Sequence, residues 1–197
     1  MRVAIYGGSF NPPHLAHQLA ITCVLATARV DELWMVPTYK HPFDKALAPF
    51  ADRARMCELA ATPFGAARVR VDRIEEELGG DSYTLRTMRA LKERHPTHDF
   101  ALVIGADLVA ERERWHGWPE LSRLVPFIVV GRQGTATTAT GGIELPAISS
   151  TLVRERIGRG EPVDALVAAD VVDYVAAHGL YRDAQPQAGQ GQGQESP

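Results

Sequence analysis

The stretch "VAIYGGSFNPPHLAH", residues 3–17, decides the fold that we expect of this chain. It begins with a continuous apolar run, which is typical of a strand buried on both faces of a parallel sheet. Two glycines then end the run. Pro12 and Pro13 follow, and prolines cannot sit inside a helix but can begin one. A strand, a glycine turn and a helix form a βα unit, and its turn lies at the carboxyl edge of the sheet, where ligands bind.

The alternation of strand and helix continues along the chain, which predicts an α/β fold. We expect a Rossmann-like, doubly wound, mainly parallel sheet flanked by helices, with further helices at the C-terminus. The stretch "RVRVDR" at 68–73 alternates polar and apolar residues, so we expect it nearer an edge of the sheet. The predicted strands are Val3–Tyr6, Leu33–Val36, Val69–Asp72, Phe100–Ile104 and Phe127–Val130, and the predicted helices are Leu15–Ala28, Asp52–Ala61, Thr84–Arg94, Ser150–Arg159 and Val163–His178.

Length and composition bound the domain organisation. The 197 residues are 45% hydrophobic, enough for a proper core, and we expect one domain over residues 1–182. The segment "QGTATTATGG" at 133–142 is small and polar, so it predicts a flexible loop. The last stretch, "DAQPQAGQGQGQESP" at 183–197, has nothing to bury and predicts a disordered tail.

Charge, hydropathy and cysteine content exclude several classes of partner. A net charge of −3 gives no global basic field, so we expect no nucleic-acid partner and only a local anion site. No apolar stretch approaches the ~18 residues of a membrane span, and the apolar start is too short for a signal peptide. Cys23 and Cys57 lie in apolar helical patterns and are expected to be unpaired thiols. We therefore expect a cytoplasmic protein with no membrane partner.

The two histidines of the opening stretch point to an anion site. We expect His14 in the first turn of the helix, where free N–H groups and the helix dipole attract anions. His17 lies three residues later on the same face, so the pair can meet one anionic group from two sides. A zinc half-site is disfavoured because no Cys, Asp or Glu accompanies the pair locally. Ser9 as a nucleophile is disfavoured because the second glycine of a G-x-S-x-G elbow is missing.

The stretch "GGSFNPPHLAH" resembles the G-[ST]-F-[DN]-P-x-H-x-x-H signature of the nucleotidyltransferase superfamily. A second signature of the superfamily, I-S-S-T-x-x-R, is similar to "ISSTLVRERI" at 148–157. Within the superfamily the chain resembles the bacterial nicotinate-mononucleotide adenylyltransferases, through "SYTLRT" at 82–87, "IGADL" at 104–108, Trp115 and "HGLYR" at 178–182. These matches cover nearly all of residues 1–182. The resemblance therefore implies that this segment is a single nucleotidyltransferase domain.

The resemblance implies adenylyl transfer from ATP to nicotinate mononucleotide, giving deamido-NAD and pyrophosphate, as a step of NAD biosynthesis. It implies that Mg²⁺ binds together with the ATP phosphates, and we expect no separate metal-binding site formed by protein side chains. Its catalytic residues would be His14, His17 and Arg154, and its ATP-binding residues would be Gly8, Ser9, Phe10, Gly105, Asp107, Ser150 and Thr151. Structural alternatives stay open: "ISST" and Asp107 could be ordinary helix caps and Arg154 a solvated charge.

For the acceptor, the resemblance implies stacking of the pyridinium ring on Trp115 and a carboxylate site at Tyr83 and Thr84. Trp115 and Trp118 could instead be core residues, and "SYT" a plain helix start. The chain departs from the family after the second strand, where "VPTYKHPFDK" at 36–45 stands in place of Pro-Pro-His-Lys. Lys40, His41 and Lys45 offer the same chemical types in another order and are candidates for the acceptor phosphate, and Arg132 is a weaker candidate.

Two other functions compete with this reading. A sister adenylyltransferase for nicotinamide mononucleotide or phosphopantetheine would share both signatures, although "SYT" and Trp115 disfavour pantetheine. A non-catalytic nucleotide sensor is disfavoured by the intact His14, His17 and Arg154. The sequence leaves the oligomeric state open, with a homo-oligomer as one option.

Overall fold

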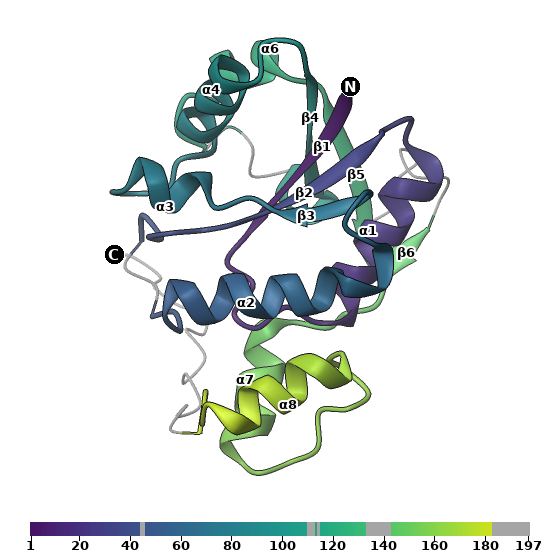
Figure 1. The fold of residues 1–197 in the computed structure, drawn as a ribbon, viewed down its shortest axis with the longest axis vertical. Helices are drawn as coiled ribbons and strands as arrows, with labels where there is room; N and C mark the ends of the chain where they lie inside the picture. Colours follow the sequence, from purple (N-terminus) through teal and green to yellow (C-terminus); the bar gives the residue numbers. More distant parts are fainter. Residues whose placement is uncertain (44–45, 110–112, 114, 133–142, 183–197) are drawn as a thin grey trace, which may run out of the picture.

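The computed structural model describes residues 1–43, 46–109, 113, 115–132 and 143–182. Its centre is a six-stranded sheet in the order β3-β2-β1-β4-β5-β6, with every neighbouring pair parallel (Figure 1). This confirms the predicted doubly wound α/β fold and places the alternating strand β3 at an edge. The strands are β1 (Arg2–Gly8), β2 (Glu32–Pro37), β3 (Val69–Val71), β4 (Asp99–Gly105), β5 (Phe127–Arg132) and β6 (Glu144–Leu145).

The central strands bury both faces, as their continuous apolar runs predict. Along β2, Leu33 and Met35 join the cluster of buried residues on one face, and Trp34 and Val36 join the cluster on the other. Successive side chains of a strand point to opposite faces, so a strand covered on both sides must be apolar throughout.

Helices cover the two faces. Buried residues of α1 and α2 pack on one face, and those of α4 and α6 pack on the other. Besides the predicted helices, the described residues form four short ones that span too few turns to show periodicity in the sequence. The helices are α1 (Leu15–Thr27), α2 (Phe50–Ala61), the 3₁₀ turn η1 (Thr62–Phe64), α3 (Ile74–Leu78), α4 (Thr84–Arg94), α5 (Ala106–Val109), α6 (Trp118–Leu124), α7 (Ser150–Gly158) and α8 (Ala169–Ala177).

The prediction of one helix over Val163–His178 is wrong in its first part. Residues 163–168 form a turn, and α8 begins only at Ala169. The carbonyl of Leu166 accepts a hydrogen bond of 2.8 Å from the backbone N–H of Leu15, at the start of α1. In a continuous helix the Leu166 carbonyl would instead accept a hydrogen bond from the backbone N–H four residues later.

Helices α7 and α8 form a third layer beyond the carboxyl end of the sheet. Figure 1 shows them together beside α2, at the end of the molecule toward which β1 runs. They share a buried cluster with Met56 and Ala60 of α2. Within the described residues, none of the helices is long and apolar enough to cross a bilayer.

Some predictions fall outside the described residues. These are the flexible loop at 133–142, the disordered tail at 183–197 and the site residue Lys45, which stay predictions. Arg132 is described only as backbone, at the end of β5.

Candidate active site

The loop that leaves β1 is closely packed against the core. Phe10 is only 1% exposed and has a φ of +45°, and its ring meets the rings of Tyr6 and His17 edge-on. A Cβ added to Gly8 would lie 3.2 Å from the Phe10 ring, so any side chain there would push the ring away from the strand by a few tenths of an ångström. The glycine turn therefore allows a close internal packing contact as well as close approach to a ligand.

The two histidines of the first signature meet as predicted, although His14 lies one position earlier in the helix. It is the N-cap of α1, with extended backbone (φ −144°), and not a residue of the first turn. Its backbone N–H donates to Nδ1 of His17 at 3.1 Å, and its carbonyl accepts from the N–H of His17 at 2.8 Å. An N-cap residue has non-helical, typically extended backbone, while its carbonyl already accepts the first helical bond. The two rings lie 3.7 Å apart between centroids.

The bond to Nδ1 also fixes the protonation pattern of the His17 ring. Nδ1 can accept only if it carries no hydrogen, so the ring N–H lies at Nε2. Nε2–H is the donor that a phosphate oxygen could use. His14 is 3% exposed and packs behind His17, so the pair forms a rigid unit at the carboxyl end of β1.

The second signature docks directly on the first. Ser149 caps α7, since its hydroxyl accepts from the N–H of Leu152 at 3.1 Å. The hydroxyl of Ser150 donates to the carbonyl of Pro12 at 2.8 Å, across 138 residues of sequence. The open alternative, that "ISST" is an ordinary cap, therefore holds for Ser149 while Ser150 makes a tertiary contact.

Arg154 joins the same junction. Its guanidinium donates to the carbonyl of Asn11 at 2.8 Å and to the hydroxyl of Thr151 at 3.2 Å, which confirms that Thr151 and Arg154 share a face. Burial lowers the pKa of Arg154 from its usual range. A guanidinium has five N–H donors, so Arg154 can hold the loop and still meet a phosphate.

Asn11 connects the loop to two other segments of the chain, and the sequence alone did not identify it. It is 2% exposed, and its Oδ1 accepts from the backbone N–H of Ala48 at 3.0 Å and from the hydroxyl of Tyr181 at 2.9 Å. Burial raises the pKa of the Tyr181 hydroxyl well above its ordinary value. The "HGLYR" segment therefore reaches the signature loop through Tyr181.

Arg53 is a second residue that sequence reasoning missed. It lies on α2 with 1% of its surface exposed, and its pKa is lowered by desolvation. Its guanidinium donates to carbonyls in the loops that follow β1 and β2. Its position in the helix could have identified it, because it is a charged residue on the buried face that also carries Met56, Cys57, Ala60 and Ala61.

The acidic candidate Asp107 lies just after β4, inside the first turn of α5. Because α5 begins at Ala106, Asp107 is not its N-cap, so that alternative is wrong. A Cβ on Gly105 would fall 2.3 Å from Oδ1 of Asp107. Gly105 thus leaves room for the carboxylate to fold back over the strand end, and its contact with adenine or ribose stays a prediction.

The acceptor candidates lie around the start of α4. Tyr83 is the N-cap of this helix and Thr84 its first residue, and the first N–H groups of a helix have no acceptor within it. The hydroxyl of Ser82 accepts from the backbone N–H groups of Tyr39 and Lys40 at 3.1 and 3.3 Å. The N–H of Ser82 donates to the carbonyl of Lys40 at 2.9 Å. The segment after β2 therefore lies against the "SYT" segment.

Lys40 itself forms a surface ion pair with Asp81, at 2.9 Å, and its side chain is 60% exposed. Trp115 is half-buried against the core cluster, 6.4 Å from Trp118 between ring centroids. Trp118 packs on Phe127 at 5.1 Å, as expected of a core residue. The exposed ring of His116, which sequence reasoning missed, lies 4.6 Å from the ring of Tyr83. The Trp115–His116 and "SYT" segments are thus neighbours.

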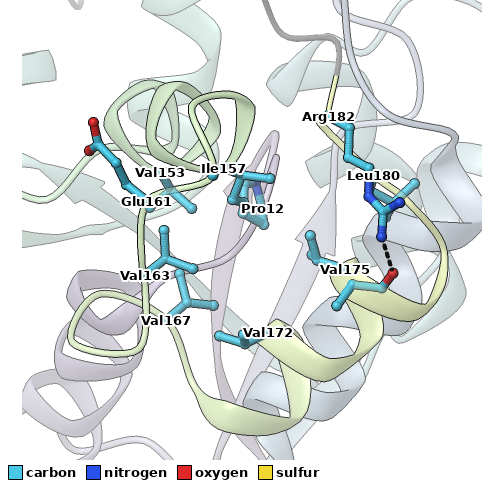
Figure 2. Close-up of a pocket in the computed structure, with 12 residues that line it drawn as sticks. Pro12, Val153, Ile157, Glu161, Val163, Val167, Val172, Val175, Leu180 and Arg182 are labelled. Carbon is cyan, nitrogen blue, oxygen red and sulfur yellow. Dashed lines mark hydrogen bonds between the residues drawn. The ribbon is translucent and has the colours of Figure 1, made fainter.

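A cavity of about 230 Å³ lies behind this site, between α7, α8 and the turn before α8 (Figure 2). Pro12 of the signature loop contributes to its wall, together with aliphatic side chains such as Val153, Val167 and Val175. In Figure 2 Arg182, beside the cavity, donates to the carbonyl of Ala176 at 3.1 Å. Its mainly aliphatic wall does not suit a nucleotide phosphate, so we place the site on the histidine side of the loop.

Comparison with known families and sequences gives a consistent result. A family profile described as cytidylyltransferase-like matches residues 5–156. A probable nicotinate-nucleotide adenylyltransferase of Anaeromyxobacter dehalogenans is 49% identical over 183 residues, covering 91% of this chain and 96% of the relative. A relative of the same description from Myxococcus xanthus is 39% identical, covering 92% and 95% of the two chains.

Solved structures show the same fold. Nicotinic acid mononucleotide adenylyltransferase of Plasmodium falciparum, complexed with NaAD, matches with a TM-score of 0.77 at 20% identity, covering 92% of this chain and 97% of that one. A nicotinate-nucleotide adenylyltransferase structure from Vibrio parahaemolyticus matches with a TM-score of 0.72 at 20% identity, over 92% and 96% of the two chains.

Proposed function

The chain belongs to the nicotinate-nucleotide adenylyltransferase family, and from this premise we propose that it transfers the adenylyl group of ATP to nicotinate mononucleotide. The products are deamido-NAD and pyrophosphate, as a step of NAD biosynthesis. One observation carries the proposal: the two signature segments dock on each other, through Ser150 to Pro12 and Arg154 to Asn11, beside the paired histidines.

The reaction needs placement more than new covalent chemistry. A phosphate oxygen of the mononucleotide attacks the α-phosphorus of ATP in line, a P–O bond forms, and the bond to pyrophosphate breaks with its electron pair on the leaving oxygen. The nucleophile is already an anion, so the protein supplies alignment and stabilises charge on the α-phosphate and pyrophosphate oxygens.

The donors suit that task. Nε2–H of His17 can donate to an α-phosphate oxygen as charge grows there, and the bond from the His14 N–H keeps the ring in the required tautomer. Arg154 and the start of α7 can hold the β- and γ-phosphates by charge-assisted and N–H hydrogen bonds. The backbone of Gly8, Ser9 and Phe10 lines the opposite side of the phosphates.

ATP enters as its Mg²⁺ complex. Within the described residues no group of three or more His, Cys, Asp or Glu side chains could hold a metal ion. The polar groups around the loop include histidines, hydroxyls and guanidinium groups, whose N–H and O–H donors suit phosphate oxygens. Mg²⁺ usually keeps several waters and binds through substrate phosphates, which fits this donor set.

The acceptor preference rests on charge. Nicotinate has a carboxylate whose two oxygens accept from N–H groups near Tyr83 and Thr84, whereas nicotinamide would turn its own NH₂ toward one of those donors. A charge-assisted bond contributes about 1.5–3 kcal/mol and a stranded donor costs about 1–3 kcal/mol. We therefore expect nicotinate mononucleotide to be preferred by about 10²-fold or more in kcat/KM.

The test is adenylyl transfer measured as pyrophosphate release with three acceptors: nicotinate mononucleotide, nicotinamide mononucleotide and phosphopantetheine. The proposal expects nicotinate mononucleotide to be the best substrate by about 10²-fold. Equal rates with the two pyridine mononucleotides would refute the carboxylate site. ATP binding without transfer to any of the three acceptors would identify a sensor instead.

We further propose that the reaction takes place in the cytoplasm. In support, Cys23 and Cys57 are both buried and free, as in a reducing compartment. A fractionation of the native host, followed by activity, would test this. Activity confined to a secreted or membrane fraction would contradict it.

A further inference from the structure

One buried arginine bridges the two loops to which the proposed function assigns the two substrates. The Arg53 guanidinium donates from Nη1 to the carbonyl of Ser9 at 2.9 Å, in the loop after β1. It donates from Nε to the carbonyl of Ala48 at 2.8 Å and from Nη2 to the carbonyl of Tyr39 at 3.3 Å, both in the segment after β2. The side chain is 1% exposed, so it holds the loops from beneath.

The two loops are adjacent because their strands are. β1 and β2 pair in parallel up to Gly8 and Pro37, and the N–H of Thr38 donates to the carbonyl of Gly8 at 2.9 Å. Past this point the chain segments diverge, and the described bonds that join them run through Arg53 and Asn11. Ser9 belongs to the ATP side, and Tyr39 precedes Lys40 on the acceptor side.

An arginine can make these three contacts, whereas a lysine cannot. Burying a cation is costly, and a charged side chain is almost never fully buried without partners. A guanidinium is a rigid planar fork with five donors, so it can reach carbonyls on both sides at fixed angles. An ammonium is a compact charge on a flexible stem and cannot hold the same three positions together.

We infer that Arg53 is a positioning residue for adenylyl transfer, which sets the distance between the ATP loop and the acceptor loop through its three carbonyl contacts. The inference rests on the proposed function. Arg53 touches backbone and not substrate, so its effect is on the alignment of the two substrates and not on the affinity for either one. A misplacement of about 1 Å at reacting atoms can cost about 10²-fold in rate.

The kinetic test compares Arg53→Lys and Arg53→Gln with the wild type. Both variants should lower kcat by about 10²-fold while the KM values for ATP and nicotinate mononucleotide stay within about threefold. Arg55→Lys and Arg55→Gln are the matched controls, because Arg55 lies on the same helix, is exposed and pairs with Glu58 at 2.8 Å. The controls should keep the wild-type kcat.

Three outcomes would overturn the inference. A wild-type kcat in Arg53→Lys would show that a positive charge at this position is sufficient and that the planar guanidinium is not needed. A rise in KM for ATP at unchanged kcat would make Arg53 a substrate ligand. An equal loss of kcat in the Arg55 variants would point to general damage of α2.

Hydrogen exchange tests the same inference without any turnover. In the ligand-free protein, Arg53→Lys should raise exchange at the backbone amides of residues 9–11 and 46–48 and leave α4 unchanged. Exchange raised evenly over the whole chain, or unchanged in both loops, would contradict a local clamp. Because this measurement needs no substrate, it separates failure of the clamp from failure of the proposed function, which would appear as an inactive wild type.

Discussion

The phosphate half and the acceptor half of the site are built differently. In the phosphate half, Phe10, Asn11 and His14 are at most 3% exposed, and the loop is tied to α2, α7 and the C-terminal segment by side-chain hydrogen bonds. In the acceptor half, Phe43 is 82% exposed, Tyr39 is 37% exposed, and Lys40 meets Asp81 in a surface ion pair. The phosphate loop is held by buried bonds, whereas the acceptor half is held by the buried Arg53 at Tyr39 and Ala48 and otherwise presents exposed side chains.

The difference follows from what each half must do. Charge stabilisation needs donors that are already in place, because their reorganisation would add to the barrier. Recognition of an acceptor tolerates other arrangements, and loops on the surface vary more than the elements they connect. Residues 40–43, the described part of the "KHPFDK" segment in which this chain departs from its family, lie in the exposed half. The predictions below test this contrast.

The largest effect is expected at His17, in the phosphate half. His17→Ala removes a preorganised donor to the α-phosphate and should lower kcat by about 10²-fold or more, with a smaller effect on ATP affinity. Steady-state kinetics and calorimetric ATP titration measure the two quantities. An unchanged kcat in a folded variant would remove His17 from the mechanism.

A smaller effect is expected at Trp115, in the acceptor half. A pyridinium over an indole gains about 0.5–2 kcal/mol, so Trp115→Ala should raise the acceptor KM by about tenfold. Nicotinate and nicotinamide mononucleotides carry the same charged ring, so the kcat/KM ratio between them should be preserved. Trp118→Leu serves as a packing control. A ratio that collapses in Trp115→Ala alone would assign selectivity to the tryptophan.

The Tyr181 hydroxyl, which ties the C-terminal segment to Asn11, should affect stability more than rate. Tyr181→Phe should lower the free energy of unfolding by about 1 kcal/mol, seen as a melting temperature lower by about 2–4 °C.

Burial raises the pKa of Tyr181 above its ordinary value, so its neutral form is favoured in the folded state. That contribution to stability is present below about pH 10 and is lost as the pH rises further. The wild type should therefore lose stability above about pH 10 more steeply than Tyr181→Phe, as a pH series of melting curves would show. Parallel curves would contradict a buried neutral hydroxyl.

The smallest effect is expected at Lys40. Its side chain is 60% exposed and paired with Asp81, and exposed ion pairs contribute about 0–1 kcal/mol. Lys40→Ala should raise the acceptor KM by about threefold and leave the ATP KM unchanged. Asp81→Asn is the matched variant, which removes the partner and keeps the lysine. A rise of the acceptor KM by more than tenfold in Lys40→Ala would show that the acceptor half depends on single contacts as strongly as the phosphate half does.

Much of the fold could be read from patterns that repeat along the sequence. Four apolar runs and the alternating stretch at 68–73 predicted the five longer strands within two residues, because a strand buried on both faces must be apolar and an edge strand need not be. The short helices and β6 left no such pattern. The turn at 163–168 escaped prediction because the contacts that hold it include a distant bond, from the N–H of Leu15 to the carbonyl of Leu166.

The sequence by itself determined the family, the doubly wound sheet and the two signature segments, since each depends on local order or on short-range periodicity. Only the tertiary structure decided that Ser150 and Arg154 hold the loop around His14 and His17, and that Asn11, Arg53 and Tyr181 support it from beneath. These contacts join residues up to 170 positions apart. The identity of a buried polar partner depends on which chain segments meet in space, and no local pattern contains that information.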